Sequence, residues 1–457
     1  MGVKQSDSVI KRHFSNLRYW WGRVCLMSIL GFIAMFGYAQ TPEQIIMLQL
    51  KQVNAKVAGT PCNTGKGMLI SNKAMNVFLN NKVSSYLSDG TDLSLFKNYV
   101  NLNTAEGRLS VSHNFHQPVD SDDYVRSFFV VGARVNVANT YAGRFSNKYF
   151  NNQLGFTLQK TWMGKPVTYY NVCGSQKFAM DAQRAVLLRG LITELERKAK
   201  AYEQDLDSVK QTEVPGQSLT SAKNALRHDF YAALRLEYLQ KFSEAQSDLL
   251  VQSNNFNLVT DNWTTFGIYL PVIPQKFQVS TDLSSDVSQR HNYPFEVFLT
   301  HTRFFESPKN GRIFFTLNAK GFINNSIQGG SLYQADVNGA SVANGAETVS
   351  INQGNRFIGN YRNFFTPAVS GKLVYIPGNS HVGVSFRVEK NFGTYHALNS
   401  ILGIPIVLID KKGAPAINFE CQLLFADMSN TIGKTQLPGN KTSVGVTVGI
   451  PFSKIVY

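Results

Sequence analysis

Residues 443–452 read SVGVTVGIPF, and large apolar residues alternate along them with small ones. One parity holds mostly serine, threonine and glycine, and the other holds Val444, Val446, Val448, Ile450 and Phe452. Because successive side chains of a β-strand leave opposite faces, this period of two predicts a strand with one apolar face and one small, polar face. What the valines contact decides the kind of β-protein that the chain forms.

The same alternation recurs in other segments. In 381–388 the even positions are valine or phenylalanine, and in 312–324 and 416–425 the odd positions are mostly apolar. Transmembrane barrel strands need about 9–11 residues, apolar outward and polar inward. In lipid, only a closed sheet satisfies every backbone N–H and C=O group. The pattern predicts a mainly β chain, folded as a closed antiparallel transmembrane β-barrel.

Composition agrees with two-faced strands. Only 16% of the 457 residues are charged, whereas about 25% is typical of soluble domains. Phenylalanine (32) and tyrosine (19) are abundant, yet the mean hydropathy is only −0.15. Apolar residues are therefore spread among polar ones instead of forming long blocks.

The N-terminus predicts export. Five basic residues precede an uncharged run over 24–38, which is short for a membrane-spanning helix, and Ala39 follows it. We expect 1–39 to be a cleaved signal peptide with Gln40 as the mature start, and an uncleaved anchor is the alternative. The leader has a net charge of +4, so removing it reduces the formal charge from +15 to +11.

Helical periodicity interrupts the strands twice. Thr41, Pro42 and Gln44 begin a short helix that ends near Gly59, within a segment 40–90 that we expect to be a periplasmic helix or plug. Apolar residues at helical spacing over 175–210 and 218–250, separated by Pro215-Gly216, predict a long helical hairpin. The barrel is expected over 91–457, interrupted by this periplasmic hairpin at 164–253. The strands expected before the hairpin are 93–103, 107–116, 125–138 and 153–163, and those after it are 264–283, 295–305, 312–324, 366–376, 381–390, 401–409, 416–425 and 443–452.

These segments make twelve strands if 264–283 is a single strand with a bulge near Pro271 and Pro274. Fourteen strands follow if the prolines mark a turn instead. In bacterial barrels the periplasmic turns are short and the outer loops long. We therefore place 307–311, 377–380 and 411–413 on the periplasmic side, and 325–360 and 427–441 outside.

At this point the chain resembles outer-membrane β-barrel proteins of Gram-negative bacteria. The resemblance covers the export signal, the strands from about 91 onward and the aromatic C-terminus at Phe452 and Tyr457, although Pro451 and Lys454 depart from the usual terminal alternation. It implies the outer membrane as location, membrane lipid as environment and the barrel-assembly machinery as a partner during insertion.

Charged residues of the polar parity are the candidate lumen-lining residues. We name five basic and three acidic ones: Arg134, Arg312, Lys320, Lys372, Arg387, Glu296, Glu389 and Glu420. Two interpretations remain open. The charges either pair into a network that plugs a narrow barrel, or they line a pore that favours anions.

A narrow channel or porin-like transporter is the favoured function. The alternative is a structural or secretion-accessory envelope protein that binds a periplasmic partner through 176–250. An outer-membrane enzyme or a secreted soluble β-sandwich ranks lower, and an exported chain is not expected to bind nucleic acid. No catalytic, cofactor or metal site is expected, since GTPCNTGK at 59–66 lacks phosphate-loop spacing and His113 and His116 lie on opposite strand faces.

Three cysteines follow the leader. Cys62 and Cys173 lie outside the expected strands and form a possible disulfide, whereas Cys421 alternates as an apolar strand residue.

Overall fold

The computed structural model describes 41–60, 65–83, 98–103, 108–115, 123–136, 153–170, 173–209, 218–282, 286–327, 332–335, 342–344, 347–349, 356–378, 380–409, 415–429 and 442–451. The expected signal peptide 1–39, Phe452 and Tyr457 lie outside these residues. Cys62, the proposed disulfide partner of Cys173, lies outside them too.

The chain divides into two compact units. The helical unit contains the described residues up to Gln52 together with Arg189–Leu239, and the barrel unit contains Val53–Leu188 and the chain from Gln240 onward.

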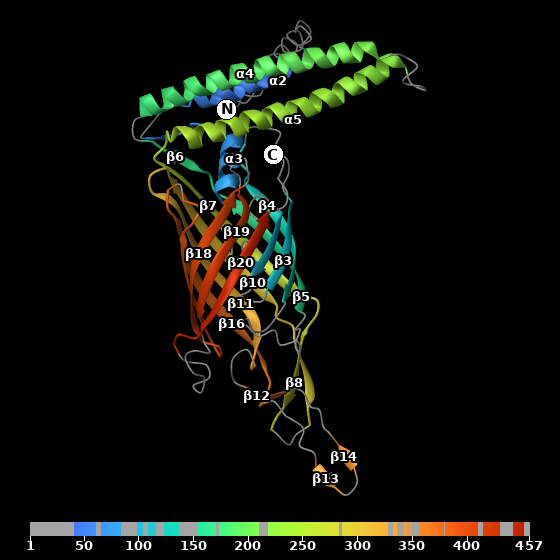
Figure 1. Cartoon of the computed structure of the whole chain (residues 1–457), viewed down its shortest axis with the longest axis vertical. Coiled ribbons are helices and arrows are strands. Elements are labelled where there is room, and N and C mark those ends of the chain that lie inside the picture. The colour runs from blue at the N-terminus through green and yellow to red at the C-terminus, as the bar shows by residue number, and fades with distance from the viewer. Residues whose placement is uncertain are drawn as a thin grey trace, which may run out of the picture. The chain divides into compact units, whose positions relative to one another are not determined.

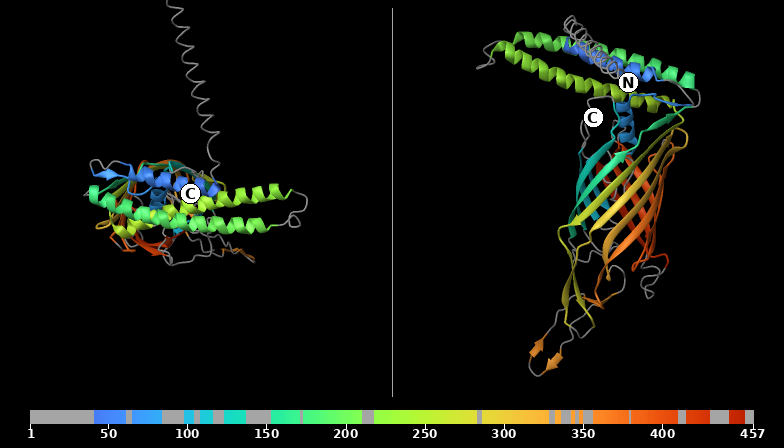
Figure 2. Two further views of the ribbon diagram at one scale, coloured as in Figure 1. Left: turned by 90° about the horizontal axis from the view of Figure 1, so that it is seen from above. Right: turned by 180° about the vertical axis from the view of Figure 1, so that it is seen from behind.

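Twelve antiparallel strands close into a barrel in the second unit (Figures 1 and 2). The closing contact joins the strands on either side of the helices and runs from Gly155 opposite Pro271 to Met163 opposite Trp263. In order around the barrel the strands are β2 (Tyr99–Asn103), β3 (Arg108–Phe115), β4 (Ser127–Asn136), β5 (Gln153–Met163), β7 (Leu258–Pro271), β10 (Glu296–Ser307), β11 (Gly311–Asn325), β16 (Asn363–Ile376), β17 (Val384–Asn391), β18 (Leu398–Ile409), β19 (Pro415–Phe425) and β20 (Thr442–Pro451). The prediction of a closed antiparallel barrel of twelve strands is confirmed.

Burial along β20 shows which face of the strand is which. Val444 is 69% exposed and Ile450 41%, whereas Gly445, Thr447 and Gly449 are buried or partly buried on the inner face. Along β16 the exposed Phe365, Val369 and Leu373 likewise alternate with the buried Thr366, Ser370 and Lys372. A soluble sheet buries its apolar face, so this inverted pattern is that of an outer-membrane β-barrel, whose apolar face meets lipid.

The two ends of the barrel differ. At one end, which we call the turn end, β10 and β11 join at 308–310, β16 and β17 at 377–383, and β18 and β19 at 410–414. At the other end, the loop end, the links 326–362 and 426–441 are long. Gly311 begins β11 with φ +84°, a conformation that favours glycine and makes the tight turn possible.

The expectation of one bulged strand over 264–283 is wrong. The barrel strand β7 begins at Leu258 and ends at Pro271, and the amides of Val272 and Ile273 both donate to the carbonyl of Leu154. Pro274 has no N–H group to continue the ladder, and the chain then leaves the barrel. The strand count of twelve still holds, because the next two strands pair with each other outside the barrel wall.

These extra strands form a small sheet at the loop end. β8 (Gln275–Ser280) pairs with β9 (Ser288–Asn292) and, in parallel, with β15 (Arg356–Ile358), which pairs with β12 (Tyr333–Ala335). Phe277, Val279 and Leu332 form its own small hydrophobic core. β13 (Val342–Asn344) and β14 (Glu347–Val349) form a separate hairpin.

Four helices complete the described chain. α2 (Pro42–Ala58) begins with the expected cap, where the Thr41 amide donates to Gln44 Oε1 at 3.1 Å. α4 (Cys173–Ser208) and α5 (Leu219–Ser253) are the two expected arms of the hairpin. No helix among the described residues is both long and apolar enough to span a membrane.

The sequence did not indicate α3 (Asn72–Val83) or the two short strands β1 (Lys66–Gly67) and β6 (Val167–Tyr169). β6 pairs with the first residues of β7, next to the point where β5 ends, and β1 pairs with β6. Two or three residues are too few to show a period of two, so these strands carried no signal.

Candidate functional site in the barrel lumen

The candidate site is the lumen of the barrel and the helix that enters it. All eight charged residues named from the sequence lie on inward-facing strand positions. Six of them are buried: Arg134, Arg312, Lys372, Arg387, Glu296 and Glu420. The remaining two, Lys320 and Glu389, are partly buried.

Two clusters of ion pairs occupy the wall formed by β11, β16, β17 and β19. Lys320 Nζ lies 2.9 Å from Glu389 Oε2, and Arg387 on the same strand as Glu389 contacts the same carboxylate. Lys372 Nζ lies 3.4 Å from Glu420 Oε2, and the Ser385 hydroxyl donates to the other oxygen of Glu420. Both cross-strand pairs reach past intervening strands, since β16 lies between Lys320 and Glu389, and β17 and β18 lie between Lys372 and Glu420. Pairing neutralises charges that would otherwise be buried alone.

The opposite wall holds a third pair. Arg134 Nη1 on β4 lies 3.5 Å from Glu296 Oε2 on β10, and its guanidinium stacks 3.8 Å from the centre of the Tyr269 ring on β7. The pair spans β5 and β7, which lie between β4 and β10, so barrel closure is what brings the two charges together.

A belt of hydroxyl side chains lies farther toward the turn end on the walls around β7 and β10. Thr161 and Thr265 share a hydrogen bond of 2.9 Å, and Thr302 and Thr316 share one of 3.0 Å. All four residues are buried. These polar side chains of the inner face are therefore satisfied by neighbours within the wall, as buried polar groups generally are.

α3 enters the barrel at the turn end (Figure 1), where it meets inward apolar residues as well as the charged Glu306. One continuous hydrophobic cluster joins the helix to the wall, with Met75 and Phe78 from α3 and Phe304, Phe314 and Ile376 from the strands. Phe78, Phe304 and Phe314 are fully buried. The helix is therefore part of the barrel interior at this end, and we call it the plug.

Hydrogen bonds cap α3 and fix its position against the barrel. Ser71 caps the helix by accepting the Ala74 amide at 3.2 Å. Asn76 donates to the carbonyl of Asp123 at 3.1 Å and accepts the amide of Val125 at 3.3 Å, which ties α3 to the entry of β4.

At the far end of α3, Lys82 Nζ lies 2.8 Å from Glu306 Oε1 on β10, and Arg312 Nε lies 3.5 Å from the other oxygen of Glu306. The sequence interpretation missed Glu306 because the expected strand ended at 305. Its even position continues the inward parity of Glu296, Thr300 and Thr302, which would have identified it.

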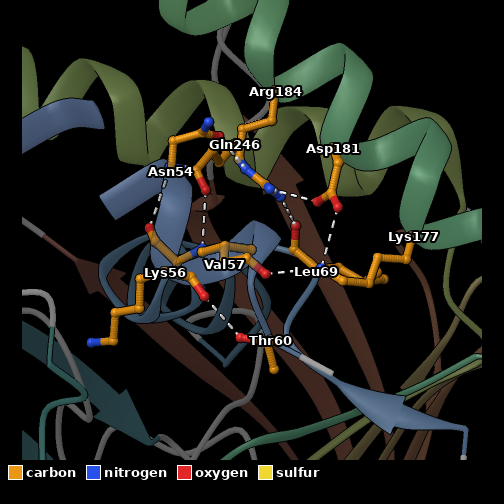
Figure 3. Close-up of polar contacts among 10 residues, drawn as sticks. Asn54, Lys56, Val57, Thr60, Leu69, Lys177, Asp181, Arg184 and Gln246 are labelled. Carbon is orange, nitrogen blue, oxygen red and sulfur yellow. Dashed lines mark hydrogen bonds and ion pairs between the residues drawn. The ribbon is translucent and has the colours of Figure 1, made fainter. Parts of the chain in front are cut away.

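The beginning of α4 and the end of α5 form hydrogen bonds with the segment that leads into α3 (Figure 3). From α4, the fully buried Arg184 donates to the Leu69 carbonyl at 2.8 Å and to Asn54 Oδ1 at 2.7 Å, and it pairs with Asp181. From α5, Gln246 Oε1 accepts the amide of Ser71 at 3.0 Å. Burial lowers the pKa of the Arg184 guanidinium, and the Asp181 contact opposes that shift.

Lys177 completes this junction. Its ammonium donates to the Val57 carbonyl at the end of α2 at 2.8 Å and lies 3.3 Å from Asp181. The Val57 carbonyl also accepts the Thr60 amide at 3.2 Å, and the cation at this helix C-terminus complements the helix dipole.

The helical unit has its own polar cluster. Arg227 on α5 forms a forked pair with Glu203 on α4, at 2.8 Å between Nη2 and Oε2 and 3.0 Å between Nε and Oε1, and the Tyr231 hydroxyl donates to Glu203 at 3.0 Å. The Arg227 hydrogen bond lowers the pKa of Glu203. Desolvation, followed by the Glu203 contact, raises the pKa of Tyr231. Tyr202 stacks on Phe230 with ring centres 3.6 Å apart.

Within the described residues, no group of three or more histidine, cysteine or acidic side chains is arranged to hold a metal ion. Cys421 is exposed on the outer face of β19 with a free thiol.

No protein-family model and no curated protein matches the chain. Among solved structures, the β domain of the Bordetella autotransporter BrkA is similar at 10% identity and a TM-score of 0.26, over 78% of this chain and 98% of that one. OmpT, an outer-membrane protein of Vibrio cholerae, is similar at 7% identity and a TM-score of 0.21, over 78% of this chain and 94% of that one. The fold described above rests on the pairing of this chain's own strands.

Proposed function

We propose that this protein is an exported outer-membrane β-barrel that is closed at rest and anchors its helical hairpin on the periplasmic side, as an accessory of an envelope or secretion assembly. The turn end, where α3 and the bases of α4 and α5 meet the barrel, faces the periplasm in this proposal, because periplasmic turns are the short ones. The proposal includes no catalytic step and no cofactor.

The observation that supports the proposal is the packing inside the barrel at two levels. Charges are paired on the inner wall, and α3 packs against the strands at the turn end through a cluster that includes the fully buried Phe78, Phe304 and Phe314. An open porin keeps a water-filled channel along its axis. A barrel closed at rest leaves the long hairpin, with arms of 36 and 35 residues, as the element available for other work.

Conductance in a planar lipid bilayer tests the closed state. We expect the wild-type protein to give no single-channel steps over a range of voltages, and steady porin-like conductance would refute the closed barrel.

The hairpin role is tested by a deletion that spares the plug. Replacing 189–239 with a short Gly-Ser linker removes the part of the hairpin in the helical unit, while Arg184 and Gln246 keep their contacts with Leu69 and Ser71. We expect the barrel to assemble and to lose a specific periplasmic partner. The partner is identified by a photo-crosslinking residue at the exposed Leu226, with the same residue at the exposed Phe392 as control. Equal capture at both positions would contradict a hairpin-specific partner.

A gated channel is the second candidate, and the way α3 is held favours it. Polar contacts join both ends of α3 to other elements, with Gln246 accepting the Ser71 amide and Lys82 pairing with Glu306. The Lys82→Glu change places two carboxylates together and should loosen the plug by charge repulsion. Appearance of conductance in K82E, but not in the turn control Lys309→Glu, would support a gate. If neither variant conducts, the gated channel is refuted and the accessory role is retained.

A further inference from the structure

The outward wall of the barrel is not uniformly apolar. On β11, β16, β19 and β20 the outward positions carry no charged side chain, and residues such as Phe315, Leu317, Leu373 and Val444 are 42–69% exposed there. This is the surface that hydrocarbon covers in a transmembrane barrel.

The neighbouring strands β5, β7 and β10 break this rule. Toward the turn end their outward positions hold polar residues, five of which we call the polar strip: Lys160, Asn262, Thr264, His301 and Arg303. Arg303 and Asn262 are exposed, and the other three are partly exposed.

The strand register brings the polar strip together. His301 lies opposite Thr264 and Arg303 opposite Asn262 on the next strand, and Thr264 lies opposite Trp162 on the strand after that. Directly opposed residues have Cβ atoms about 4.5–5.5 Å apart. Thr264 Oγ1 and His301 Nδ1 are already hydrogen-bonded at 3.0 Å. Lys160 on β5 lies opposite Phe266, two residues along β7 from Thr264. Arg303 lies two residues along β10 from His301, on the other side of this pair.

In the part of the chain that the structure describes, neither Lys160 nor Arg303 forms an ion pair. An arginine or lysine on the lipid face of a barrel is destabilising, most of all at the membrane midplane and less near an interface. An anion that meets both cations would remove this cost.

Depth in the membrane identifies the source of that anion. Arg303 precedes the end of β10 at Ser307 by four residues, and Lys160 precedes the end of β5 at Met163 by three. At about 3.3 Å per residue and a tilt near 40°, Arg303 lies roughly 10 Å from the strand end, and its long side chain can reach the headgroup level. Trp162, 49% exposed beside the strip, is a residue type enriched at that level.

We propose that the polar strip binds the phosphate of an anionic glycerophospholipid from the leaflet at the turn end. Arg303 supplies a planar fork for two phosphate oxygens, Lys160 supplies a second charge from the other side of β7, and Thr264 and His301 form the polar centre between them. The exposed side chains of Phe266, Leu299 and Phe315 offer the acyl chains an apolar wall next to the headgroup. The proposal requires only that the barrel lies in a membrane and does not depend on the role of the hairpin.

Native mass spectrometry of the detergent-purified protein tests the site. With phosphatidylglycerol supplied in the micelles, we expect the wild type to retain lipid at least tenfold more than a Lys160→Gln/Arg303→Gln variant. The control Arg126→Gln/Lys309→Gln removes two exposed cations near the turn end and should retain lipid as the wild type does. Phosphatidylethanolamine should be retained less, and excess inorganic phosphate should not displace the lipid. Equal retention by K160Q/R303Q, no preference for the anionic lipid, or a co-purifying protein that K160Q/R303Q alone loses would overturn the proposal.

A second measurement does not depend on how K160Q/R303Q folds. Trp162 lies beside the polar strip, whereas Trp263 is fully buried in the lumen. The difference between the wild-type and Trp162→Phe spectra gives the emission of Trp162. Brominated phosphatidylglycerol should quench this emission at a lower mole fraction than brominated phosphatidylethanolamine does. Identical quenching curves for the two lipids would refute an anionic-lipid site even if the barrel is otherwise intact.

Discussion

Glycines on the inner face determine where the largest lumen side chains lie. A Cβ atom built on Gly267 would collide with the Phe298 ring, and one on Gly403 would collide with the carboxylate of Glu420 and the hydroxyl of Ser385. A large inward side chain on one strand therefore extends over a glycine on its neighbour. The alternation in the sequence predicted small residues on this face. In the structure these glycines leave the space that particular side chains of the neighbouring strands occupy.

Gly267→Ala should destabilise the barrel, because the Phe298 ring cannot keep its position beside the new methyl group. Overpacking of a well-filled interior costs about 1–3 kcal/mol. Urea-induced unfolding in lipid vesicles measures the loss, and Gly267→Ala combined with Phe298→Leu should recover most of it. If the second change adds to the loss, the ring is not the obstacle.

Glu420 is the acceptor for two lumen donors, Lys372 and Ser385, and both charged side chains of its ion pair are nearly fully buried. Glu420→Leu alone should lower the free energy of unfolding by about 3–5 kcal/mol, because it leaves the Lys372 charge without this partner. Adding Lys372→Met should restore most of the loss, since two apolar residues of similar volume replace the pair. The same urea titration provides the comparison. Equal destabilisation in the single and double variants would mean that the Lys372 charge is not the cause.

At the scale of single elements, the helices begin or end on specific polar contacts. α2 starts with the Thr41–Gln44 cap and ends at the Lys177 ammonium, and α3 starts at Ser71. α4 and α5 are joined across the hairpin by the Arg227–Glu203 fork and by Lys198, which lies 2.7 Å from Glu237. Exposed ion pairs of this kind contribute at most about 1 kcal/mol each. The stacked Tyr202 and Phe230 rings contribute about 0.5–1.5 kcal/mol beyond the area they bury, which is of the same order as an ion pair.

The helical unit should loosen in acid. The folded-state pKa of Glu203 is lower than that of free glutamate, so its contribution is fully present above the ordinary pKa of about 4.3 and is lost as the pH falls through the folded value. Hydrogen exchange of 189–239, corrected for the intrinsic pH dependence of exchange, should show less protection at low pH. Glu203→Gln should show the lower protection at neutral pH and less change on acidification. An unchanged pH response in E203Q would exclude Glu203 as the titrating group.

At the scale of the whole molecule, the barrel presents its apolar face outward on nearly every strand. The mature chain should therefore stay monodisperse only in detergent or lipid, because the exposed band of valine, leucine and phenylalanine would otherwise associate. The folded barrel should also migrate differently from the boiled chain on a denaturing gel. A monodisperse chain in plain buffer, with no shift on boiling, would contradict the membrane assignment.

Local sequence patterns were enough to predict the barrel, the strand count of twelve and the hairpin, whose helices were expected at 175–210 and 218–250 and lie at Cys173–Ser208 and Leu219–Ser253. Both signals are local, since a period of two or of 3.6 needs no knowledge of distant residues. The same parity placed all eight charged candidates on the inner face.

Which charge meets which depends on the folded barrel. Arg134 reaches Glu296 because β5 and β7 close the barrel between them, and Lys82 reaches Glu306 because α3 enters the turn end. The short strands β1 and β6, the end of β7 at Pro271 and the plug itself likewise depended on partners far along the chain. Alternation along a strand gives the face of each residue, but a lumen contact also needs the register and closure of the sheet, and these arise only when distant strands pair.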